Sequence, residues 1–386
     1  MKEHHVQDLD SISEDSLIAK GGRKWSSFPG SLGAFIAEMD FGVAPGVRQA
    51  LREVDERDLF GYAPQSIVSD LKSATSAFCA ERYGWQFPEQ HVELASDVIA
   101  SFLGILTHLT PADTPIVLPT PAYMPFFDVA AVSGRELIEV PMIRSETGWS
   151  VDLDAVDAAL VPGATLVLCN PHNPIGKVYT ETELLELAEV VERNDARVFS
   201  DEIHAPLVYE PARHIPYASL NETTASHTAT ATAASKAFNI PGLKCAQLIF
   251  TNADDRAIWA KKGNFVSGAA SNPGILATTA AYTQSGDWLA EITAYLRGNR
   301  ELLTDLVATH LPNATFLPPE GTYLAWLDMR GYGLETGLSE HFNAQAHVAI
   351  TEGRLCGEVG AGHIRFNFAL PRPLLTEAIA RIASAL

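Results

Sequence analysis

The stretch SKAFNIPGL, residues 235–243, places a single lysine, Lys236, between a run of small residues at 229–234 and an apolar turn. Only Ser235 is a polar immediate neighbour, whereas a surface lysine usually has charged or polar company. Taken alone, Lys236 would still be interpreted as exposed, because lysine is almost never fully buried unless it is paired. An earlier stretch of the chain changes that interpretation.

That earlier stretch is SDEIH, residues 200–204, which continues the mainly apolar run ARVF at 196–199. The run predicts a buried strand that delivers Asp201 and His204 at its carboxyl end, where ligands bind in open α/β sheets. Pyridoxal 5'-phosphate (PLP) requires two groups from a protein: a lysine amine that can bond to its aldehyde, and an acid that can keep its ring nitrogen protonated. Lys236 and Asp201 can supply both.

Length and charge narrow the class of protein. The chain has 386 residues, of which 47% are hydrophobic, and this suits one large domain with a smaller one. Its net charge of −20 argues against a nucleic-acid partner, because phosphate backbones require clustered Lys and Arg. We therefore expect a small-molecule substrate.

Neither a targeting sequence nor a membrane segment nor a metal site is indicated. Residues 1–16 are polar and acidic and lack the basic and apolar regions of a signal peptide. The apolar stretch at 98–109 is too short to span a bilayer. The four cysteines show no CxxC spacing, and His204 has no second imidazole at metal-ligand spacing. We expect a cytoplasmic protein without a membrane partner.

The segment at 165–201 is predicted to form a strand, a turn, a helix and a second strand. The helix at 181–193 begins with capping-box spacing, and the order of elements predicts a parallel crossover. The turn NPHNPIG at 170–176 therefore leaves a strand's carboxyl end, as Asp201 does, and it carries Asn173. An asparagine beside proline is by itself usually only a turn former.

A phosphate site is suggested where an apolar helix begins after a predicted strand at 92–95. A helix N-terminus presents free backbone N–H groups and the positive end of the helix dipole. Most helix starts bind nothing, so this pattern is weak alone. The candidate donors are the N–H groups of Val98 and Ile99, and Asp97 is expected to cap the helix with its side chain turned away.

Two further side chains have positions that suit a site. Tyr123 follows a predicted strand at 116–118 and a turn with two prolines, which would hold its ring as a rigid wall; a core aromatic is an equally open interpretation. Arg365 lies in the alternating stretch HIRFNF at 363–368, a predicted strand. A buried arginine needs a counter-charge, and its forked guanidinium matches a carboxylate, either of a ligand or of a structural ion pair.

In this order, the motifs resemble the PLP-dependent aminotransferase superfamily of fold type I, and more narrowly its cystathionine β-lyase, or carbon-sulfur lyase, branch. The resemblance runs from about Trp25 to the C-terminus. It implies an α/β large domain at 42–282 with a mostly parallel seven-stranded sheet between helices. It also implies a smaller α+β domain, made of an N-terminal arm at 1–41 and of residues 283–386, and a homodimer.

The resemblance implies roles around the cofactor ring. Lys236 would be the catalytic residue that bonds to PLP, Asp201 would face the ring nitrogen, and Asn173 would bind the phenolic oxygen. Tyr123 would stack on the ring. His204 stands where many aminotransferases have tyrosine, close enough to tune the cofactor.

It also implies roles at the phosphate and at the substrate. Ser235 and Lys244 would join the helix start as phosphate ligands, although Lys244 is equally open to interpretation as a solvated loop lysine. Tyr62 would reach the phosphate of the partner subunit, although a Gly-Tyr pair is more often a packed turn. Arg365 would bind the substrate's α-carboxylate.

The implied reaction is a β-elimination on an amino acid with sulfur at its β carbon. Cystathionine would yield homocysteine, pyruvate and ammonia, a step of methionine biosynthesis. An aminotransferase would use the same residues, and a non-catalytic regulator or a metal-dependent hydrolase are more distant alternatives. The DEIH sequence at 201–204 and the segments at 37–41 and 23–25 favour the lyase. The preferred sulfur amino acid cannot be predicted from the sequence.

Overall fold

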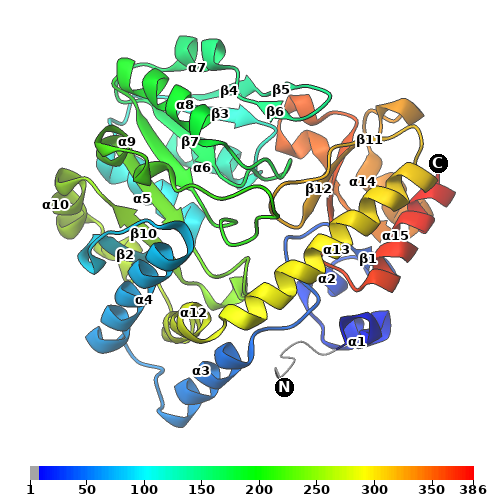
Figure 1. Cartoon of the computed structure of the whole chain (residues 1–386), viewed down its shortest axis with the longest axis horizontal. Helices are drawn as coiled ribbons and strands as arrows, with labels where there is room; N and C mark the ends of the chain where they lie inside the picture. Colours follow the sequence, from blue (N-terminus) through cyan, green and yellow to red (C-terminus); the bar gives the residue numbers. More distant parts are fainter. Residues whose placement is uncertain (1–7) are drawn as a thin grey trace.

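The computed structural model describes residues 8–386. Its main feature is a seven-stranded sheet in the order β2-β10-β9-β8-β7-β3-β4 (Figure 1). Strand β10 pairs antiparallel with β2 and β9, and the other pairs are parallel, so the predicted mostly parallel sheet is confirmed. The strands are β2 (Val92–Ala95), β3 (Ile116–Thr120), β4 (Leu137–Pro141), β7 (Thr165–Cys169), β8 (Arg197–Asp201), β9 (Thr228–Thr232) and β10 (Ala246–Phe250).

Helices cover both faces of this sheet, which explains why nearly every residue of its central strands is buried. In β7, Val167 packs on one face with Phe102 of α5 and Phe126 of α6. Its neighbour Leu166 packs on the other face with Leu184 of α8. The covering helices are α5 (Val98–Leu109), α6 (Pro125–Ser133) and α10 (Ala253–Lys262) on the first face, and α7 (Leu153–Ala159) and α8 (Glu181–Arg193) on the second.

The crossover from β7 through α8 to β8 has the predicted form. Helix α8 spans the predicted residues, and its capping box is present between Thr180 and Glu183. Because β7 and β8 pair in parallel, with Cys169 opposite Asp201, the turn after β7 and the residues after β8 lie at the same edge of the sheet.

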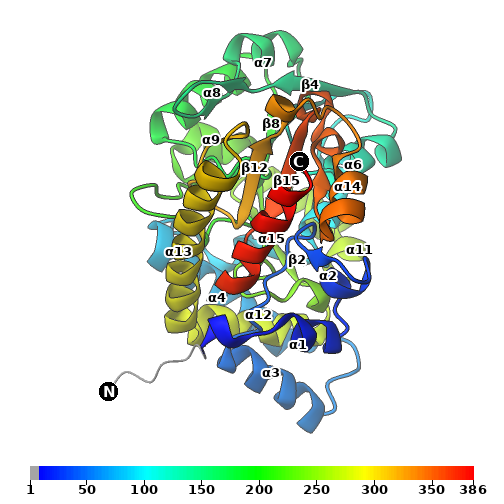
Figure 2. The same ribbon diagram turned by 90° about the vertical axis from the view of Figure 1, so that its right-hand side faces the viewer.

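A second, four-stranded antiparallel sheet has the order β11-β12-β15-β14. The long helix α13 (Gly286–His310) and the last helix α15 (Arg372–Ser384) pack together beside it (Figure 2) and share its apolar core. Its strands are β11 (Thr315–Phe316), β12 (Leu324–Asp328), β14 (Thr351–Glu352) and β15 (His363–Asn367).

The N-terminal residues from Leu9 onwards pack into the apolar core beside this second sheet. Strand β1 (Leu32–Gly33) pairs in parallel with β13 (Val348–Ala349), after helices α1 (Glu14–Ala19) and α2 (Arg23–Ser26). Residues 34–41 then form neither helix nor strand. This packing agrees with a small domain that includes an N-terminal arm, while its boundaries at 42 and 282 stay a prediction.

The remaining elements surround these two sheets. Helix α12 packs against α3 and α4, at the side where the chain leaves the N-terminal segment (Figure 1). These elements are α3 (Pro45–Glu56), α4 (Gln65–Tyr83), α9 (Glu222–His227), α11 (Asn264–Ser267), α12 (Asn272–Gln284), α14 (Leu338–His341) and the hairpin β5 (Ile143–Arg144) with β6 (Trp149–Ser150).

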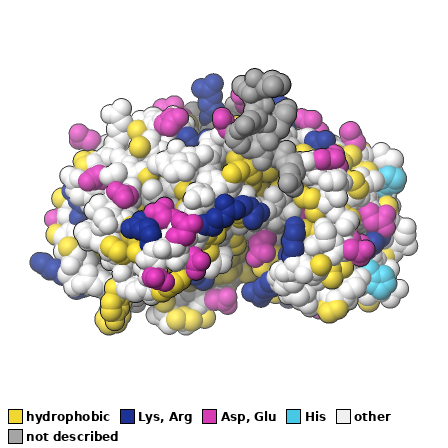
Figure 3. Space-filling view, turned by 90° about the horizontal axis from the view of Figure 1, so that it is seen from below, with side chains coloured by type: hydrophobic (Ala, Val, Ile, Leu, Met, Phe, Trp, Pro, Cys, Tyr) yellow, Lys and Arg dark blue, Asp and Glu magenta, His cyan; other side chains and the backbone are white. Residues whose placement is uncertain are grey.

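The surface is mixed in charge on the face drawn in Figure 3, where Lys and Arg side chains are interspersed with Asp and Glu. Within residues 8–386, none of the helices combines the length and the apolar character that crossing a membrane requires.

Candidate active site

A cavity of about 340 Å³ lies at the carboxyl ends of the central strands, a volume in the range of small-molecule sites. The structure brings most of the sequence-predicted site residues together in its wall. These are Val98, Ile99, Tyr123, Asn173, Asp201, His204, Ser235, Lys236 and Lys244. Arg365 contacts Asn173 from the side, and Tyr62 lies elsewhere on the surface.

Lys236 is half-buried in the loop that follows β9, and its Nζ donates a hydrogen bond to the carbonyl of Ala37 at 3.0 Å. Burial lowers the pKa of Lys236 to about 8, and the nearby charge of Arg365 contributes in the same direction. Glu38 and Asp201 partly oppose this shift. A substantial fraction of the amine is therefore neutral near pH 8, as a nucleophile or a base must be.

Asp201 is the last residue of β8, and only 3% of it is exposed. Its Oδ1 accepts a hydrogen bond from the Ile203 N–H at 3.1 Å, and the Cys169 thiol lies 3.9 Å from Oδ2. Burial raises the pKa of Asp201 to about 7, and the negative charge of Glu202 adds to this effect. Burial disfavours the charged form of this carboxyl group, so a positively charged ligand group beside it would stabilise the carboxylate.

His172, which the sequence interpretation did not single out, links two walls of the cavity. Burial lowers its pKa to about 4, so the ring is neutral. Its Nε2 lies 2.8 Å from the carbonyl oxygen of Pro121, which can only accept, so Nε2 carries the hydrogen and Nδ1 accepts from the hydroxyl of Tyr179 at 3.1 Å. The turn with Asn173 is thereby fixed to the turn with Tyr123.

His204 is buried in the cavity wall with its ring edge towards Tyr323, at a centroid distance of 6.2 Å. Burial lowers the pKa of His204 to about 3, and the charges of Lys236 and Arg365 contribute, so the ring is neutral. Its Nδ1 is buried and has no hydrogen-bond partner within residues 8–386. Buried polar atoms are usually paired, so this nitrogen indicates a ligand as its partner.

The N-terminus of α5 forms the other end of the cavity. Asp97 caps the helix as predicted, because its Oδ1 accepts from the Ala100 N–H at 2.8 Å. The carboxylate is not turned away from the cavity, however. Asp97 lies in the cavity wall, and its Oδ2 is 3.0 Å from Nζ of Lys244, which also lines the wall. The ion pair therefore neutralises a charge that would otherwise face an anion.

Arg365 is buried in β15 without a counter-ion, because no acidic side chain between residues 8 and 386 forms an ion pair with it. Its Nη1 donates to Oδ1 of Asn173 at 3.2 Å, and its Nη2 donates to the carbonyl of Phe35 at 2.9 Å. Its Nε is buried and has no hydrogen-bond partner among residues 8–386. The structural ion pair considered from the sequence is therefore not formed by the described chain. A buried charge without a partner is costly, which favours an anionic ligand.

Tyr62 lies outside this cavity. It is fully exposed in the loop between α3 and α4, at 102% relative exposure, and nearby Phe60 is 69% exposed. The Nδ2 of Asn272 holds this loop through the carbonyls of Leu59 and Gly61, at 3.1 and 3.0 Å. Within one chain, Tyr62 does not contribute to the site.

Two further groups at the site were missed because the sequence pattern does not mark them. The hydroxyl of Tyr323 donates to the carbonyl of Ala37 at 2.9 Å, and this carbonyl also accepts from Lys236. A tyrosine next to an apolar strand, as Tyr323 is to β12, is typical of a core, and a backbone carbonyl carries no mark of residue type in the sequence. Only the spacing of Tyr323 after Gly321 in the stretch GTYLAWL could have drawn attention to it.

The comparisons with known proteins agree with this geometry. The family model for aminotransferase class I and II matches residues 36–382. The cystathionine beta-lyase of Corynebacterium glutamicum is 35% identical over 367 residues, which cover 94% of this chain and 96% of that protein.

Two crystal structures extend this similarity to the whole fold. The PLP-bound C-S lyase from Staphylococcus hominis has a TM-score of 0.88 at 27% identity and covers 98% of each chain. Cystalysin from Treponema denticola, which contains PLP, has a TM-score of 0.91 at 25% identity and covers 100% of this chain and 99% of its own.

Proposed function

The chain belongs to the aminotransferase class I and II family, and from this premise we propose how its residues perform the work of a PLP-dependent carbon-sulfur β-lyase. The enzyme cleaves cystathionine, or related cysteine S-conjugates, with the uptake of one water molecule, to a thiol, pyruvate and ammonia. The cystathionine beta-lyase of C. glutamicum and the C-S lyase of S. hominis support this activity. The observation that carries it is the convergence of Lys236, Asp201 and uncompensated Arg365 around one cavity.

The residues present fit PLP. Asp201, whose pKa is raised by burial and by the charge of Glu202, would pair with the ring nitrogen. The amide of Asn173 would meet the phenolic oxygen, and Tyr123 would cover one face of the ring. The unpartnered nitrogen of His204 is a further polar atom for the cofactor.

The other end of the cavity fits a phosphate. The N–H groups at Val98 and Ile99 begin α5, and the hydroxyl of Ser235 lines the same wall. Lys244 adds a positive charge, which is now shared with Asp97. Helix starts of this kind attract phosphate because unsatisfied N–H groups and the helix dipole act together.

Arg365 would bind the α-carboxylate of the substrate. Its Nη1 donates a hydrogen bond to Asn173, which holds the guanidinium in place. Its buried Nε has no partner in the described chain and can therefore donate to a ligand. A carboxylate can take two parallel hydrogen bonds from such a fork and would also supply the missing negative charge.

Lys236 would move the proton. Bound PLP draws electrons away from the substrate's α carbon, which makes the α proton removable. The neutral amine of Lys236 takes that proton, since its pKa of about 8 leaves it partly unprotonated at working pH. The bond from the β carbon to sulfur then breaks, and the thiolate needs little acid assistance because thiols have a pKa of about 8.5.

We also propose a homodimer in which Tyr62 reaches the phosphate of the partner subunit. Its complete exposure, next to the exposed ring of Phe60, supports this role, because adjacent exposed aromatics are typical of interfaces. Sedimentation checks the proposal: a fully active monomer would contradict it. Action in the cytoplasm is part of the same proposal, and it agrees with four free, buried cysteines.

The decisive experiment measures pyruvate release from cystathionine by the purified, PLP-loaded enzyme. We expect pyruvate and homocysteine in equal amounts. If the enzyme binds PLP but releases no pyruvate, a keto acid is added as an amino acceptor. Transamination under those conditions would replace the lyase assignment with an aminotransferase.

A further inference from the structure

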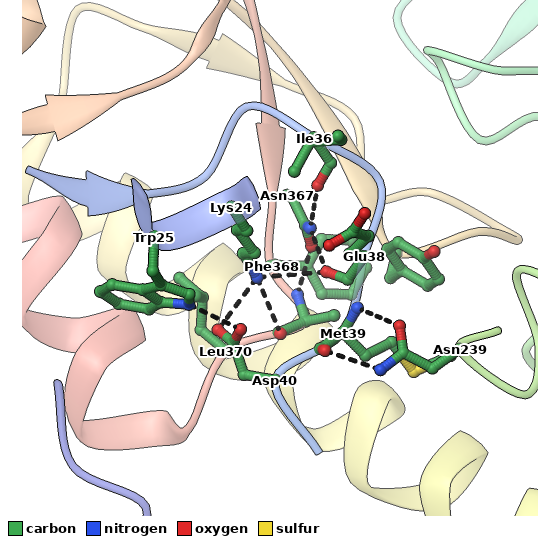
Figure 4. Close-up of polar contacts among 12 residues, drawn as sticks. Lys24, Trp25, Ile36, Glu38, Met39, Asp40, Asn239, Asn367, Phe368 and Leu370 are labelled. Carbon is green, nitrogen blue, oxygen red and sulfur yellow. Dashed lines mark hydrogen bonds and ion pairs between the residues drawn. The ribbon is translucent and has the colours of Figure 1, made fainter. Parts of the chain in front are cut away.

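Residues 36–42, here called the bridging segment, pass between the two sheets and are held by two asparagine side chains (Figure 4). Asn239 donates to the carbonyls of Met39 and Gly42, at 2.8 and 3.1 Å, and accepts from the Met39 N–H at 2.9 Å. Asn367 donates to the carbonyls of Ile36 and Glu38, each at 2.7 Å. The segment makes one internal backbone hydrogen bond, from the Glu38 N–H to the carbonyl of Ile36 at 2.9 Å, and the two asparagines donate to four of its backbone carbonyls.

One asparagine follows a strand of the first sheet, and the other ends a strand of the second. Asn239 lies three residues after Lys236 in the loop that follows β9, and Asn367 lies two residues after Arg365 at the end of β15. The bridging segment is therefore tied to the stretch that carries the catalytic lysine and to the strand that carries the arginine.

A buried ion pair holds the bridging segment near its C-terminal end, at Asp40 (Figure 4). Nζ of Lys24 lies 2.9 Å from Oδ2 of Asp40, and both side chains are almost completely buried. Nε1 of Trp25 donates to Oδ1 of Asp40 at 2.9 Å. Breaking one partner of such a pair would leave an uncompensated buried charge, so the anchor resists displacement of the segment.

Between these attachments lies the carbonyl of Ala37, which accepts from Nζ of Lys236 at 3.0 Å and from the hydroxyl of Tyr323 at 2.9 Å. A carbonyl oxygen has two lone pairs, so both are used. To act as the proposed base, Lys236 would need a free amine that stays near the substrate. The Ala37 carbonyl is the hydrogen-bond acceptor that the structure offers to that free amine.

We propose that Asn239 and Asn367 are positioning residues, which hold the bridging segment so that the Ala37 carbonyl receives the free amine of Lys236. This inference rests on the proposed role of Lys236. It has a measurable consequence for proton affinity. An ammonium group donates a stronger hydrogen bond than a neutral amine, so the carbonyl stabilises the charged form and keeps the pKa of Lys236 from falling further.

The experiment uses the apo-protein and therefore does not depend on turnover. Formaldehyde and cyanoborohydride methylate only neutral amines, and mass spectrometry of the Lys236 peptide across pH gives the midpoint of its reactivity. For the wild type we expect a midpoint near 8. For the double variant Asn239→Gly, Asn367→Ala we expect it about one pH unit lower, and for each single variant a smaller decrease. Exposed Lys261 serves as an internal reference for the reagent.

The variants are chosen to separate positioning from folding. Asn239 has a φ of +58°, a conformation that glycine adopts without strain and alanine does not, so glycine removes the side chain alone. If Asn239→Gly does not fold, Asn239→Asp takes its place, since it keeps the acceptor and loses both donors. Asn299→Ala is the matched control for Asn367: Asn299 is equally buried and donates to two carbonyls, those of Phe368 and Leu370, which are outside the bridging segment.

We expect the control to lose stability but to keep the wild-type midpoint. In the PLP-loaded enzyme, Asn239→Gly should lower kcat by about tenfold with little change in KM, because substrate binding is not altered. An unchanged midpoint in both folded single variants, or an equal shift in Asn299→Ala, would overturn the inference. Absence of pyruvate from the wild type would refute the lyase activity instead, and the midpoints would still be measurable.

Discussion

The two ends of the cavity differ in how their charged groups meet solvent. At the end that we propose holds the cofactor ring, here called the ring end, Asp201 is 3% exposed, and burial moves its pKa to about 7 and that of Lys236 to about 8. At the end that we propose holds the phosphate, here called the phosphate end, the side chains of Lys244 and Asp97 are 59% and 39% exposed and pair with each other. At the ring end, burial therefore shifts pKa values towards the range in which proton transfer occurs. At the phosphate end, the exposed charge of Lys244 would attract an anion, and water and salt weaken that attraction.

The largest expected effect compares two lysines, one at each end. We expect Lys236→Ala to lower pyruvate formation by about 10³-fold or more, because it removes the base. We expect Lys244→Ala to retain activity within about tenfold at saturating PLP, and to weaken PLP binding mainly at low salt, since it removes one exposed charge. Initial rates and PLP titrations at two salt concentrations measure both.

Equal losses of activity for the two lysine variants at saturating PLP would contradict the prediction that the buried lysine acts in proton transfer and the exposed one only in cofactor binding. Added methylamine provides a further check, because a small amine can occupy the space left by the side chain of Lys236. Partial recovery in Lys236→Ala, and none in Lys244→Ala, is the expected result.

The next largest effect concerns Asp201→Asn. We expect PLP affinity and turnover to fall by about 100-fold, since the amide cannot balance a cationic ring nitrogen. The apo-protein should become more stable above pH 7, by on the order of 4 kcal/mol, because the wild type then pays for a buried, unpaired carboxylate. Chemical denaturation of the apo-proteins across pH measures the difference.

The sign of this pH dependence follows from the raised pKa. Between its unfolded value near 4 and its folded value of about 7, Asp201 binds a proton only in the folded state. Wild-type stability therefore rises as pH falls through this window, and the advantage of Asp201→Asn disappears near pH 4. An advantage that is constant from pH 4 to 8 would show that Asp201 is not neutral in the apo-protein.

A smaller effect is expected for Arg365→Lys. We expect kcat/KM for amino acid substrates to fall by about 50-fold, because an ammonium group cannot form the two parallel hydrogen bonds of the guanidinium. The test compares a cysteine S-conjugate with its α-amide. The wild type should strongly prefer the carboxylate and the variant should not. A preserved preference would assign carboxylate binding to another group.

The fold and the residues of the ring end could be predicted because each element is marked by residues that are close together in the sequence. Strand β8 ends at Asp201, β7 leads into Asn173, and each is a short apolar run followed by a polar turn. The partners of Lys236 could not be predicted in this way. Tyr323 and Ala37 are 286 residues apart, and their contact joins a hydroxyl to a backbone carbonyl, so neither spacing nor residue type marks it.

At the phosphate end, one contact of Asp97 could be predicted from the sequence and another could not. The capping role of Asp97 follows from its place before an apolar helix, and the structure confirms it. Its pairing with Lys244 joins residues 147 positions apart and depends on how β2 and β10 lie next to each other in the sheet. Local pattern thus predicts the hydrogen bond within the helix, whereas the ion pair depends on the folded sheet.

The smallest expected effect belongs to Asp97→Asn. Partial burial would raise the pKa of Asp97, but hydrogen bonds from the Ala100 N–H and Lys244 outweigh it, so the pKa lies below its usual range and the side chain is charged at neutral pH. Asparagine caps helices as well as aspartate does, so α5 should keep its N-terminus. Removing the charge frees Lys244 for the phosphate. We expect PLP to bind about threefold more tightly at low salt.

Asp152→Asn is the matched control, because Asp152 caps α7 in the same way, with Oδ1 accepting from the Ala155 N–H at 2.9 Å, and it does not line the cavity. Its PLP affinity should equal that of the wild type at every salt concentration. The gain in Asp97→Asn should disappear at about 1 M salt, where screening acts over roughly 3 Å. Weaker binding in Asp97→Asn would mean that the carboxylate orients Lys244 towards the phosphate, so that the exposed end of the cavity is as ordered as the buried one.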